Sequence, residues 1–161
     1  MAPKFKPVDL PWTPNPLAVR TQGPADTRLA PDAPVLGVFD GSSALAWRLN
    51  TKPKDGAEAQ TVDGKLLLWN GTTVNASAYK PIATAADGTG SRNVTVRKVV
   101  WDPRREAPAA PFKDDETASK WDVTGRCIEG QLKGWTLEPL DAVQVKWRAW
   151  AAEYPATKIV E

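Results

Sequence analysis

Catalytic chemistry that depends on imidazole is closed to this chain, because its 161 residues include no histidine. A Ser-His-Asp triad or a Cys-His pair needs that ring as general base, and many zinc sites use it as a ligand. The chain has one cysteine, Cys127, so it can form no internal disulfide and no pair of thiol ligands. We therefore expect no cofactor, no metal site and no catalytic residue, and the composition favours a protein that is not an enzyme.

The remaining reactive groups are acidic residues, amines and the thiol. Asp114, Asp115 and Glu116 could offer oxygen ligands to Ca²⁺, but they lack the alternating spacing of a calcium loop. We interpret this cluster as a solvated turn. Arg126 beside Cys127 could lower the thiol pKa, yet without a histidine or a second cysteine we expect Cys127 to be a small buried side chain. No spacing distinguishes a glycosidase pair among the 19 acidic residues.

Eight tryptophans are many for a chain of this length. Exposed indole rings stack on sugars and bases and accept cations on their faces. Four of the eight fit ordinary packing, because they lie in a helix stripe or in patterned strands: Trp147, Trp150, Trp47 and Trp121. For the other four, packing is the first interpretation and a ligand or partner surface is the alternative. These candidate binding residues are Trp12, Trp69, Trp101 and Trp135.

Charge and hydropathy argue against two classes of partner. The chain has 21 basic and 19 acidic residues, a net charge of +2, whereas a nucleic-acid binder usually carries a strong basic patch. The longest apolar runs fall far below the about 20 residues that span a bilayer. Residues 1–17 show no signal-peptide pattern in the chain as given. Three N-x-S/T triplets, at Asn70, Asn75 and Asn93, are compatible with a secreted glycoprotein.

Proline divides the chain into two parts. Eight of the fifteen prolines lie in residues 1–34. Because proline fixes φ and lacks a backbone N–H, this stretch can be neither a helix nor a central strand. We predict an extended, proline-rich arm over 1–34 and a single mainly-β domain over 35–161. Trp12 and Leu17 could dock the arm on its own domain, or they could anchor it on another chain.

Hydrophobic patterning in the second part predicts short strands. Residues 35–39 and 44–49 flank a glycine-containing turn, which favours a hairpin. Residues 65–70 are apolar without alternation, as is typical of a strand covered on both faces. Within residues 92–101 the buried side changes near Arg97, so we predict a bulge there or a strand that passes from one sheet to a second.

One helix is predicted near the C-terminus, over about residues 141–154. Asp141 can cap it, and Gln144 stands at the capping-box spacing. Its apolar stripe at helical spacing comprises Val143, Trp147, Trp150, Ala151 and Tyr154. The predicted fold is therefore mainly β (α+β), a small barrel or a two-sheet sandwich, with one C-terminal helix and an N-terminal proline-rich arm.

Several stretches resemble a bacterial and archaeal protein family. Residues 114–121 read D-D-E-T-A-S-K-W, and residues 125–134 read G-R-C-I-E-G-Q-L-K-G. With the W-x-x-W helix and the P-x-T that follow, this pattern resembles the C-terminal half of domain-of-unknown-function family 3179, over residues 114–161. Residues 35–48 resemble an upstream strand pair more weakly. The resemblance implies a shared fold and an extracytoplasmic address, periplasmic or secreted, and it brings no activity.

The chain also departs from the family pattern. Family members carry a C-P-x-C-G motif in their middle, which suggests a metal or redox role, but no cysteine stands between Asn50 and Arg92 here. Ala118 and Gln131 replace a glycine and a proline, and Cys127 stands where the family has a small residue. Whatever the cysteine pair does, this chain cannot do it in that way.

We therefore expect a non-catalytic, extracytoplasmic binding or assembly protein. It would contact another protein, or a second copy of itself, through the arm and the loop tryptophans. A carbohydrate or small-ligand module that uses exposed tryptophans is the alternative. An enzyme or metal accessory protein of unknown activity is the second alternative.

Overall fold

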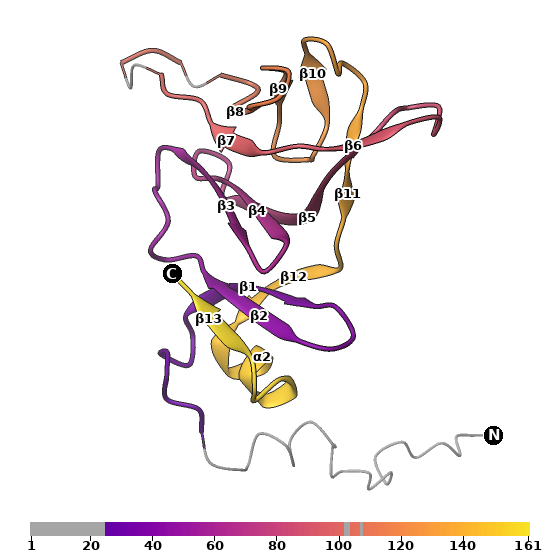
Figure 1. Ribbon diagram of the computed structural model, residues 1–161. Coiled ribbons are helices and arrows are strands. Elements are labelled where there is room, and N and C mark those ends of the chain that lie inside the picture. Colours follow the sequence, from indigo (N-terminus) through magenta and orange to yellow (C-terminus); the bar gives the residue numbers. More distant parts are fainter. Residues whose placement is uncertain (1–24, 102–103, 107) are drawn as a thin grey trace, which may run out of the picture.

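Three stacked sheets and one C-terminal helix make up the computed structural model, which describes residues 25–101, 104–106 and 108–161 (Figure 1). Sheet A has the strand order β12 (Ala142–Lys146), β1 (Pro34–Phe39), β2 (Ala44–Arg48), β13 (Lys158–Val160). Sheet B has the order β11 (Thr136–Pro139), β5 (Asn75–Thr84), β4 (Lys65–Asn70), β3 (Ala57–Val62), and β6 (Ser91–Asn93) also pairs with β5. Sheet C has the order β10 (Cys127–Glu129), β9 (Lys120–Trp121), β8 (Phe112–Asp114), β7 (Val96–Lys98). Helix α2 (Trp147–Glu153) packs on the outer face of sheet A.

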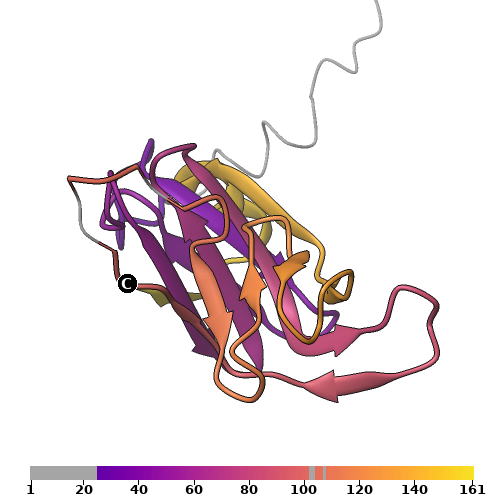
Figure 2. The same cartoon turned by 90° about the horizontal axis from the view of Figure 1, so that it is seen from above.

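This architecture confirms the mainly-β fold with a C-terminal helix. In the described part of the chain no sheet closes into a barrel, and the layers form a sandwich with three sheets where two were predicted. The third is sheet C, whose strands are only two or three residues long. Figure 2 shows the layers from above, with the hairpin of β5 and β6 projecting beyond them.

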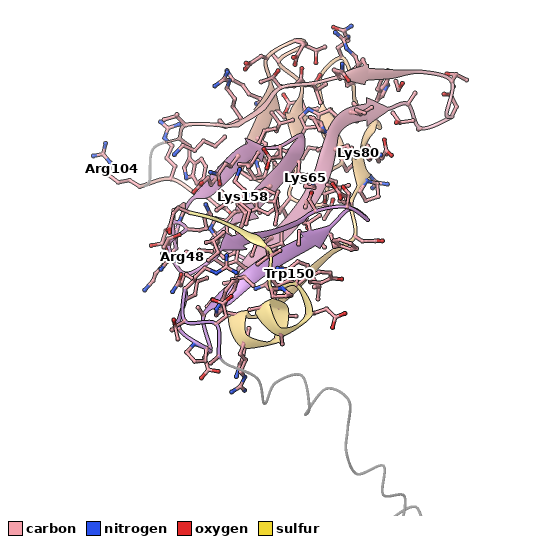
Figure 3. All side chains as sticks on the ribbon, turned by 60° about the horizontal axis from the view of Figure 1, so that its bottom comes forward. Arg48, Lys65, Lys80, Arg104, Trp150 and Lys158 are labelled. Atoms are coloured by element: carbon pink, nitrogen blue, oxygen red, sulfur yellow. The ribbon has the colours of Figure 1, made fainter. Side chains whose placement is uncertain are left out.

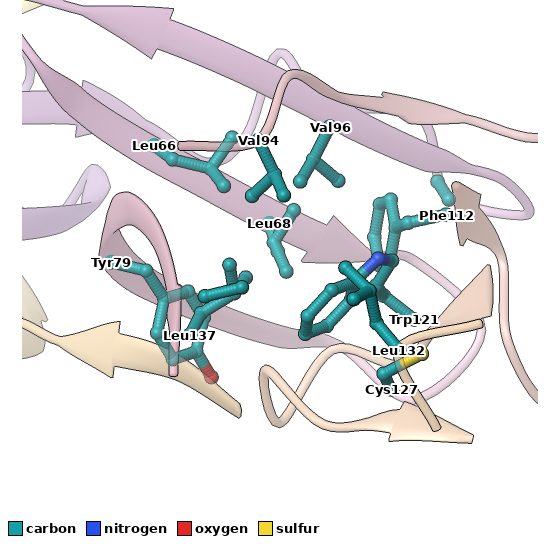
Figure 4. Packing of buried hydrophobic residues seen from close by; sticks show 12 residues of the cluster. Leu66, Leu68, Tyr79, Val94, Val96, Phe112, Trp121, Cys127, Leu132 and Leu137 are labelled. Atoms are coloured by element: carbon teal, nitrogen blue, oxygen red, sulfur yellow. The ribbon is translucent and has the colours of Figure 1, made fainter. Parts of the chain in front are cut away.

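Sheet B lies in the middle and is covered on both faces. Leu66 and Leu68 of β4 pack in the cluster shared with sheet C (Figure 4). Leu67 and Trp69, on the opposite face, pack in the cluster shared with sheet A. Each fully buried leucine side chain contributes about 1.5–3 kcal/mol to the free energy of unfolding. The prediction that residues 65–70 form a strand covered on both faces is confirmed.

The chain passes from sheet B to sheet C between β6 and β7. The predicted passage from one sheet to another is therefore confirmed, but its predicted place near Arg97 is wrong. The change falls at Val94, which stands between the two strands and whose N–H donates to the carbonyl of Pro81, 3.0 Å away. Val94 and Val96 both bury their side chains between the sheets. Arg97 already lies in sheet C and is exposed.

The predicted helix over residues 141–154 is wrong in its first half. Ala142–Lys146 forms strand β12, which pairs antiparallel with β1, so that Val143 lies opposite Gly37. The alternation of Val143 and Val145 satisfies a strand as well as a helix, and pairing with a buried neighbouring strand decides between them. Helix α2 therefore has seven residues. None of the helices in the described residues has the length and apolar character needed to cross a bilayer.

The described end of the arm, residues 25–33, packs against α2. The indole N–H of Trp147 donates to the carbonyl of Asp26 over 3.1 Å. The Arg28 guanidinium lies over the Trp147 ring, 5.2 Å from its centroid, and donates to the carbonyls of Thr157 (2.8 Å) and Pro155 (3.1 Å). This part of the arm thus lies on its own domain, whereas residues 1–24, with Trp12 and Leu17, lie outside the described residues.

Candidate binding surface

A pair of aromatic rings, the exposed Phe39 and the half-buried Tyr154, lies where α2 ends above sheet A. Phe39 is the last residue of β1 and Tyr154 directly follows α2. Their ring centroids are 4.8 Å apart and the ring planes are tilted by 32°. Phe39 is 40% exposed, a high value for a large apolar side chain. We call Phe39 and Tyr154 the aromatic ridge.

Trp150 supports the ridge from below. Its ring centroid lies 4.3 Å from that of Tyr154, and its indole N–H donates to the Thr157 hydroxyl over 2.9 Å. The indole rests directly on the backbone of β1, because a Cβ at Gly37 would overlap its ring. Figure 3 shows Trp150 between α2 and the strands of sheet A. The rotamer of Trp150, and with it the position of Tyr154, is therefore fixed by packing.

The short helix leaves one end of sheet A uncovered. Alternate residues of β1 face α2, and Phe39 is the last of them. It lies beyond the end of α2, which has only seven residues. Val143, opposite Gly37 on β12, is 46% exposed beside it. Large apolar side chains at the surface mark contact sites when they gather with hollows between them.

Two hollows flank the ridge. The first has a volume of about 420 Å³ and lies between Phe39, Tyr154 and the chain from Leu140 to Val143. The second has a volume of about 410 Å³ and lies between the same two rings and residues 155–158. The ridge therefore separates two concave spaces of nearly equal size.

Two charged residues beside the ridge, Asp40 and Lys65, are paired with each other. Hydrogen bonds from the N–H of Ser43, from the Lys65 ammonium and from Ser42 hold the pKa of Asp40 well below its usual range. The Lys65 ammonium, whose side chain is buried, lies 2.9 Å from the Asp40 carboxylate. The ridge thus offers aromatic and apolar surface beside the paired charges of Asp40 and Lys65, and the exposed Asp141 lines the first hollow.

The tryptophans named from the sequence do not form one site. Trp69 is buried, and its indole N–H donates to the carbonyl of Pro53 over 2.8 Å. Trp101 is half-buried and lines a separate hollow of about 250 Å³ with Pro53 and the exposed Val100. Trp135 is half-buried against the core between sheets B and C. Trp12 lies outside the described residues.

Sequence reasoning missed Phe39 and Val143 as surface residues. Phe39 is the last residue of an apolar strand and Tyr154 ends an apolar stripe, so both patterns indicate core. The available signal is Gly37 within the strand, since a glycine there often marks the close approach of another group. That group is Trp150, whose ring also packs against Tyr154.

The motif residues in sheet C form a closed polar network. Asp114 is fully buried, and its carboxylate accepts bonds from the Thr117 N–H (2.6 Å), the Thr117 hydroxyl (2.8 Å) and the Trp121 indole N–H (2.8 Å). The Ser119 hydroxyl, 2.6 Å from that of Thr117, accepts the N–H of Leu132 over 3.0 Å. The interpretation of Asp114 as part of a solvated turn is wrong, because Asp114 is the acceptor that fixes this turn.

Cys127 belongs to the same closed region. It is 1% exposed, which confirms a small buried side chain, and its thiol lies 3.4 Å from the carbonyl of Glu129 (Figure 4). Burial raises the pKa of the thiol, and hydrogen bonds with Glu129 and Ser119 oppose this only in part. A protonated, enclosed thiol is a poor nucleophile. No group of three or more histidine, cysteine or acidic side chains that could hold a metal occurs in the described part of the chain.

Backbone geometry explains the glycines of the motif. Gly130 has φ of +107°, and a Cβ there would lie 2.8 Å from the Cα of Ser119. Ala118, between Thr117 and Ser119, has φ of +57°, a conformation that favours glycine. This is the position at which the resemblance leads one to expect glycine. The motif therefore describes how a tight turn packs around Asp114.

Three sheets in layers with one helix on the outer face define a layered β-sandwich domain. The chain belongs to the family described as Protein of unknown function (DUF3179), whose family model matches residues 12–160. The match covers most of the chain, including the part of the arm that contains Trp12. Searches of curated proteins and of solved structures find no match.

Proposed function

We propose that this protein is a non-catalytic, extracytoplasmic binding or assembly protein, which holds an extended, proline-rich protein segment on the aromatic ridge. The observation that carries the proposal is the ring of Phe39, 40% exposed, which packs on the half-buried Tyr154 between two hollows of about 420 and 410 Å³. The closed network around Asp114 and the buried thiol of Cys127 offer no comparable access.

The shape of the ridge suits a polyproline II helix. Such a helix has three residues per turn and about 3.1 Å of rise per residue, so prolines three positions apart project on the same side about 9 Å from each other. Aromatic-lined grooves bind this helix by taking prolines into neighbouring slots. Two hollows separated by one aromatic ridge would supply such slots. The rigidity of the ligand limits the entropy lost on binding.

Fluorescence anisotropy tests the proposal with a labelled peptide that has two prolines three residues apart. We expect saturable binding to the full chain, and a dissociation constant about tenfold or more higher for Phe39→Ala, because a buried phenylalanine contributes about 1.5–3 kcal/mol. Val100→Ala removes an exposed valine outside both hollows and serves as the control. Equal binding of the peptide with both prolines replaced by alanine would overturn the proposal.

The extracytoplasmic address rests on the family resemblance. Fractionation of the source cells, followed by detection with an antibody to this chain, tests it independently of the ligand. We expect the protein in the periplasmic or secreted fraction. Recovery in the cytoplasmic fraction would contradict this part of the proposal, but it would not affect the proposed binding of a segment on the aromatic ridge.

A carbohydrate is the second candidate ligand, favoured by the hollow beside Trp101. The half-buried indole of Trp101 lies near the exposed Lys98 in that hollow, and an indole face can stack on a sugar ring. Tryptophan fluorescence titrated with a panel of glycans tests this candidate. We expect quenching that is lost in Trp101→Ala, and an unchanged signal with every glycan would eliminate it.

A further inference from the structure

We infer that two copies of this chain pair through strand β12, so that sheet A of one copy continues into sheet A of the other as one antiparallel sheet. The inference concerns the edge of sheet A and names a second copy as the partner. It therefore goes beyond the proposed function, which concerns a segment held on the aromatic ridge.

Strand β12 forms one edge of sheet A. It pairs with β1, and no other strand of the described residues lies beside it. Proteins commonly protect such edges with proline, a bulge or a short strand. β12 has five residues, no proline and an unbroken register with β1. The opposite edge, β13, has only three residues, and its Lys158 is paired with Asp63. β12 is thus the edge of sheet A that can accept another strand.

The backbone of β12 presents hydrogen-bonding groups on its free side. The Trp147 N–H donates over 2.8 Å to the carbonyl of Ala33, which lies opposite it in the continued register with β1. Backbone groups alternate in direction along a strand, so those of Val143 and Val145 also point to β1. The groups that point away from β1 are the N–H and C=O of Ala142 and Gln144 and the N–H of Lys146.

A second copy fits this edge in an antiparallel register centred on Gln144. Each Gln144 N–H then donates to the Gln144 carbonyl of the other copy, and each Lys146 N–H donates to the Ala142 carbonyl of the other copy. On the face that carries α2, the exposed Val143 of each copy lies opposite the half-buried Val145 of the other. Apolar pairs directly opposite one another stabilise antiparallel sheets. One strand therefore supplies both halves of a symmetric contact.

Charge favours an antiparallel second copy over a parallel one. The exposed Asp141 directly precedes β12, and the exposed Lys146 and Arg148 lie at its other end. These two cations share one oxygen of Asp32, which lies 3.6 Å from each, so this end keeps an excess of positive charge. Antiparallel pairing brings the acidic end of each copy to the basic end of the other. Parallel pairing would bring like charges together.

The helices leave room for the pairing. Helix α2 packs over β1 and β12, with Trp150 resting on Gly37. Neighbouring strands lie about 4.8 Å apart, so the axes of the two α2 helices would lie about 10–14 Å apart on one face of the joined sheet. Packed helices need about 8–10 Å between their axes. The two helices therefore fit side by side.

Sedimentation velocity of the full chain measures the association. Because the contact is one short strand from each copy, we expect a weak dimer, mostly dissociated at about 1 µM and mostly formed at about 100 µM. Gln144→Pro removes an outward-pointing N–H at an exposed edge position, where proline is tolerated. It should raise the dissociation constant about tenfold or more. Gln144→Ala keeps that N–H and is the matched control, with the affinity of the wild type.

Disulfide formation tests the register, and it remains decisive if Gln144→Pro fails to fold. Residues directly opposite in a hydrogen-bonded pair have Cα atoms about 5.5 Å apart, a distance that a disulfide can bridge. Gln144→Cys should therefore link two chains under mild oxidation. Ala142→Cys, also exposed and on the same face of β12, is the matched control, because its two copies would lie about 14 Å apart along the strands. We expect linking about tenfold or more faster at position 144.

A wild-type chain that stays monomeric at about 100 µM would overturn the inference. A dimer that is equally stable in Gln144→Pro and links equally fast at positions 142 and 144 would also overturn it, because the contact would then lie elsewhere. Neither result bears on the proposed function, which the labelled peptide and Phe39→Ala test separately.

Discussion

The region around Asp114 and the region around Phe39 differ in how far their side chains are exposed to solvent. In sheet C the carboxyl group of Asp114 is fully buried, and two nearby residues donate three hydrogen bonds to it. At the end of sheet A the ring of Phe39 is 40% exposed, although buried side chains of α2 and β1 pack together beside it. The polar side chain of Asp114 is therefore enclosed, whereas the aromatic side chain of Phe39 is accessible to solvent.

The residue types that suggest a reaction and the accessible surface therefore lie in different regions of the molecule. Residues 114–121 carry acids, hydroxyls and an indole, the residue types that suggest a reaction, and they bond to one another. Phe39 is exposed and Tyr154 is half-buried, and both line two hollows. The motif residues therefore fix a turn of the fold, and the ridge is the surface on which the proposed function rests.

Asp114→Ala should produce the largest change in stability. It leaves the Thr117 N–H and the Trp121 indole N–H without an acceptor in a buried site, at a cost of about 1–3 kcal/mol for each group. We expect a loss of about 3–5 kcal/mol in the free energy of unfolding, measured by urea denaturation. Asp115→Ala, next in the chain, removes only an exposed ion pair with Arg97 and should cost less than about 1 kcal/mol. Equal losses in the two variants would contradict the closed network.

Gly37→Ala should have the next largest effect. The new methyl group would overlap the Trp150 indole, so the helix has to shift away from β1. We expect a loss of about 1–3 kcal/mol together with an altered near-ultraviolet circular dichroism signal. Gly90→Ala is the control, because the nearest atom to its Cβ is 3.8 Å away in Trp135. A Gly37→Ala variant as stable as the control would show that Trp150 does not rest on β1.

Ala118→Gly should raise stability. The residue has φ of +57°, which costs a non-glycine residue about 1 kcal/mol or more, and the larger backbone entropy of glycine in the unfolded chain offsets part of the gain. We expect an increase of up to about 1 kcal/mol in the free energy of unfolding. Ala142→Gly, at an exposed strand position, should lower it by about 0.5–1 kcal/mol. The same sign in both variants would argue against strain in the turn.

Cys127 should make a small, pH-dependent contribution. Burial raises its pKa in the folded state above the ordinary value of about 8.5. The contribution to stability is therefore complete below the ordinary pKa and is lost as the pH rises through the folded-state pKa. Urea denaturation from about pH 7 to about pH 10 should show a larger decline for the wild type than for Cys127→Ala. Parallel curves would contradict a buried, protonated thiol.

The sequence predicts the fold class well where one pattern admits one structure. The unbroken apolar run of β4 belongs to that kind, whereas the passage of the chain to another sheet is predicted near Arg97 and occurs at Val94. Residues 142–146 show the limit, because Val143 and Val145 satisfy both helical and strand spacing until β1 is present as a partner. Pairing between distant segments is information that local patterning does not contain.

The candidate surface could not be predicted from the sequence for a related reason. Whether Phe39 is covered depends on where α2 ends. The helix starts beside Ala33, runs along β1 and ends at Glu153, and Tyr154 then packs against the Phe39 ring. For Trp69 packing is the first interpretation, and the ring is indeed buried, with its indole N–H donating to the Pro53 carbonyl. The exposure of an aromatic ring thus depends on which segments, distant in the sequence, pack against it in the fold.

The most direct test of the account measures stability and binding together in Asp114→Ala and Phe39→Ala. The two values are the free energy of unfolding and the dissociation constant of the labelled proline-rich peptide, taken under conditions in which both variants are folded. We predict that Asp114→Ala loses about 3–5 kcal/mol of stability and keeps its peptide affinity. Phe39→Ala should lose about tenfold or more in affinity and less than about 1 kcal/mol of stability, because the ring is already partly exposed. Weakened binding in folded Asp114→Ala, with unchanged binding in Phe39→Ala, would contradict the account.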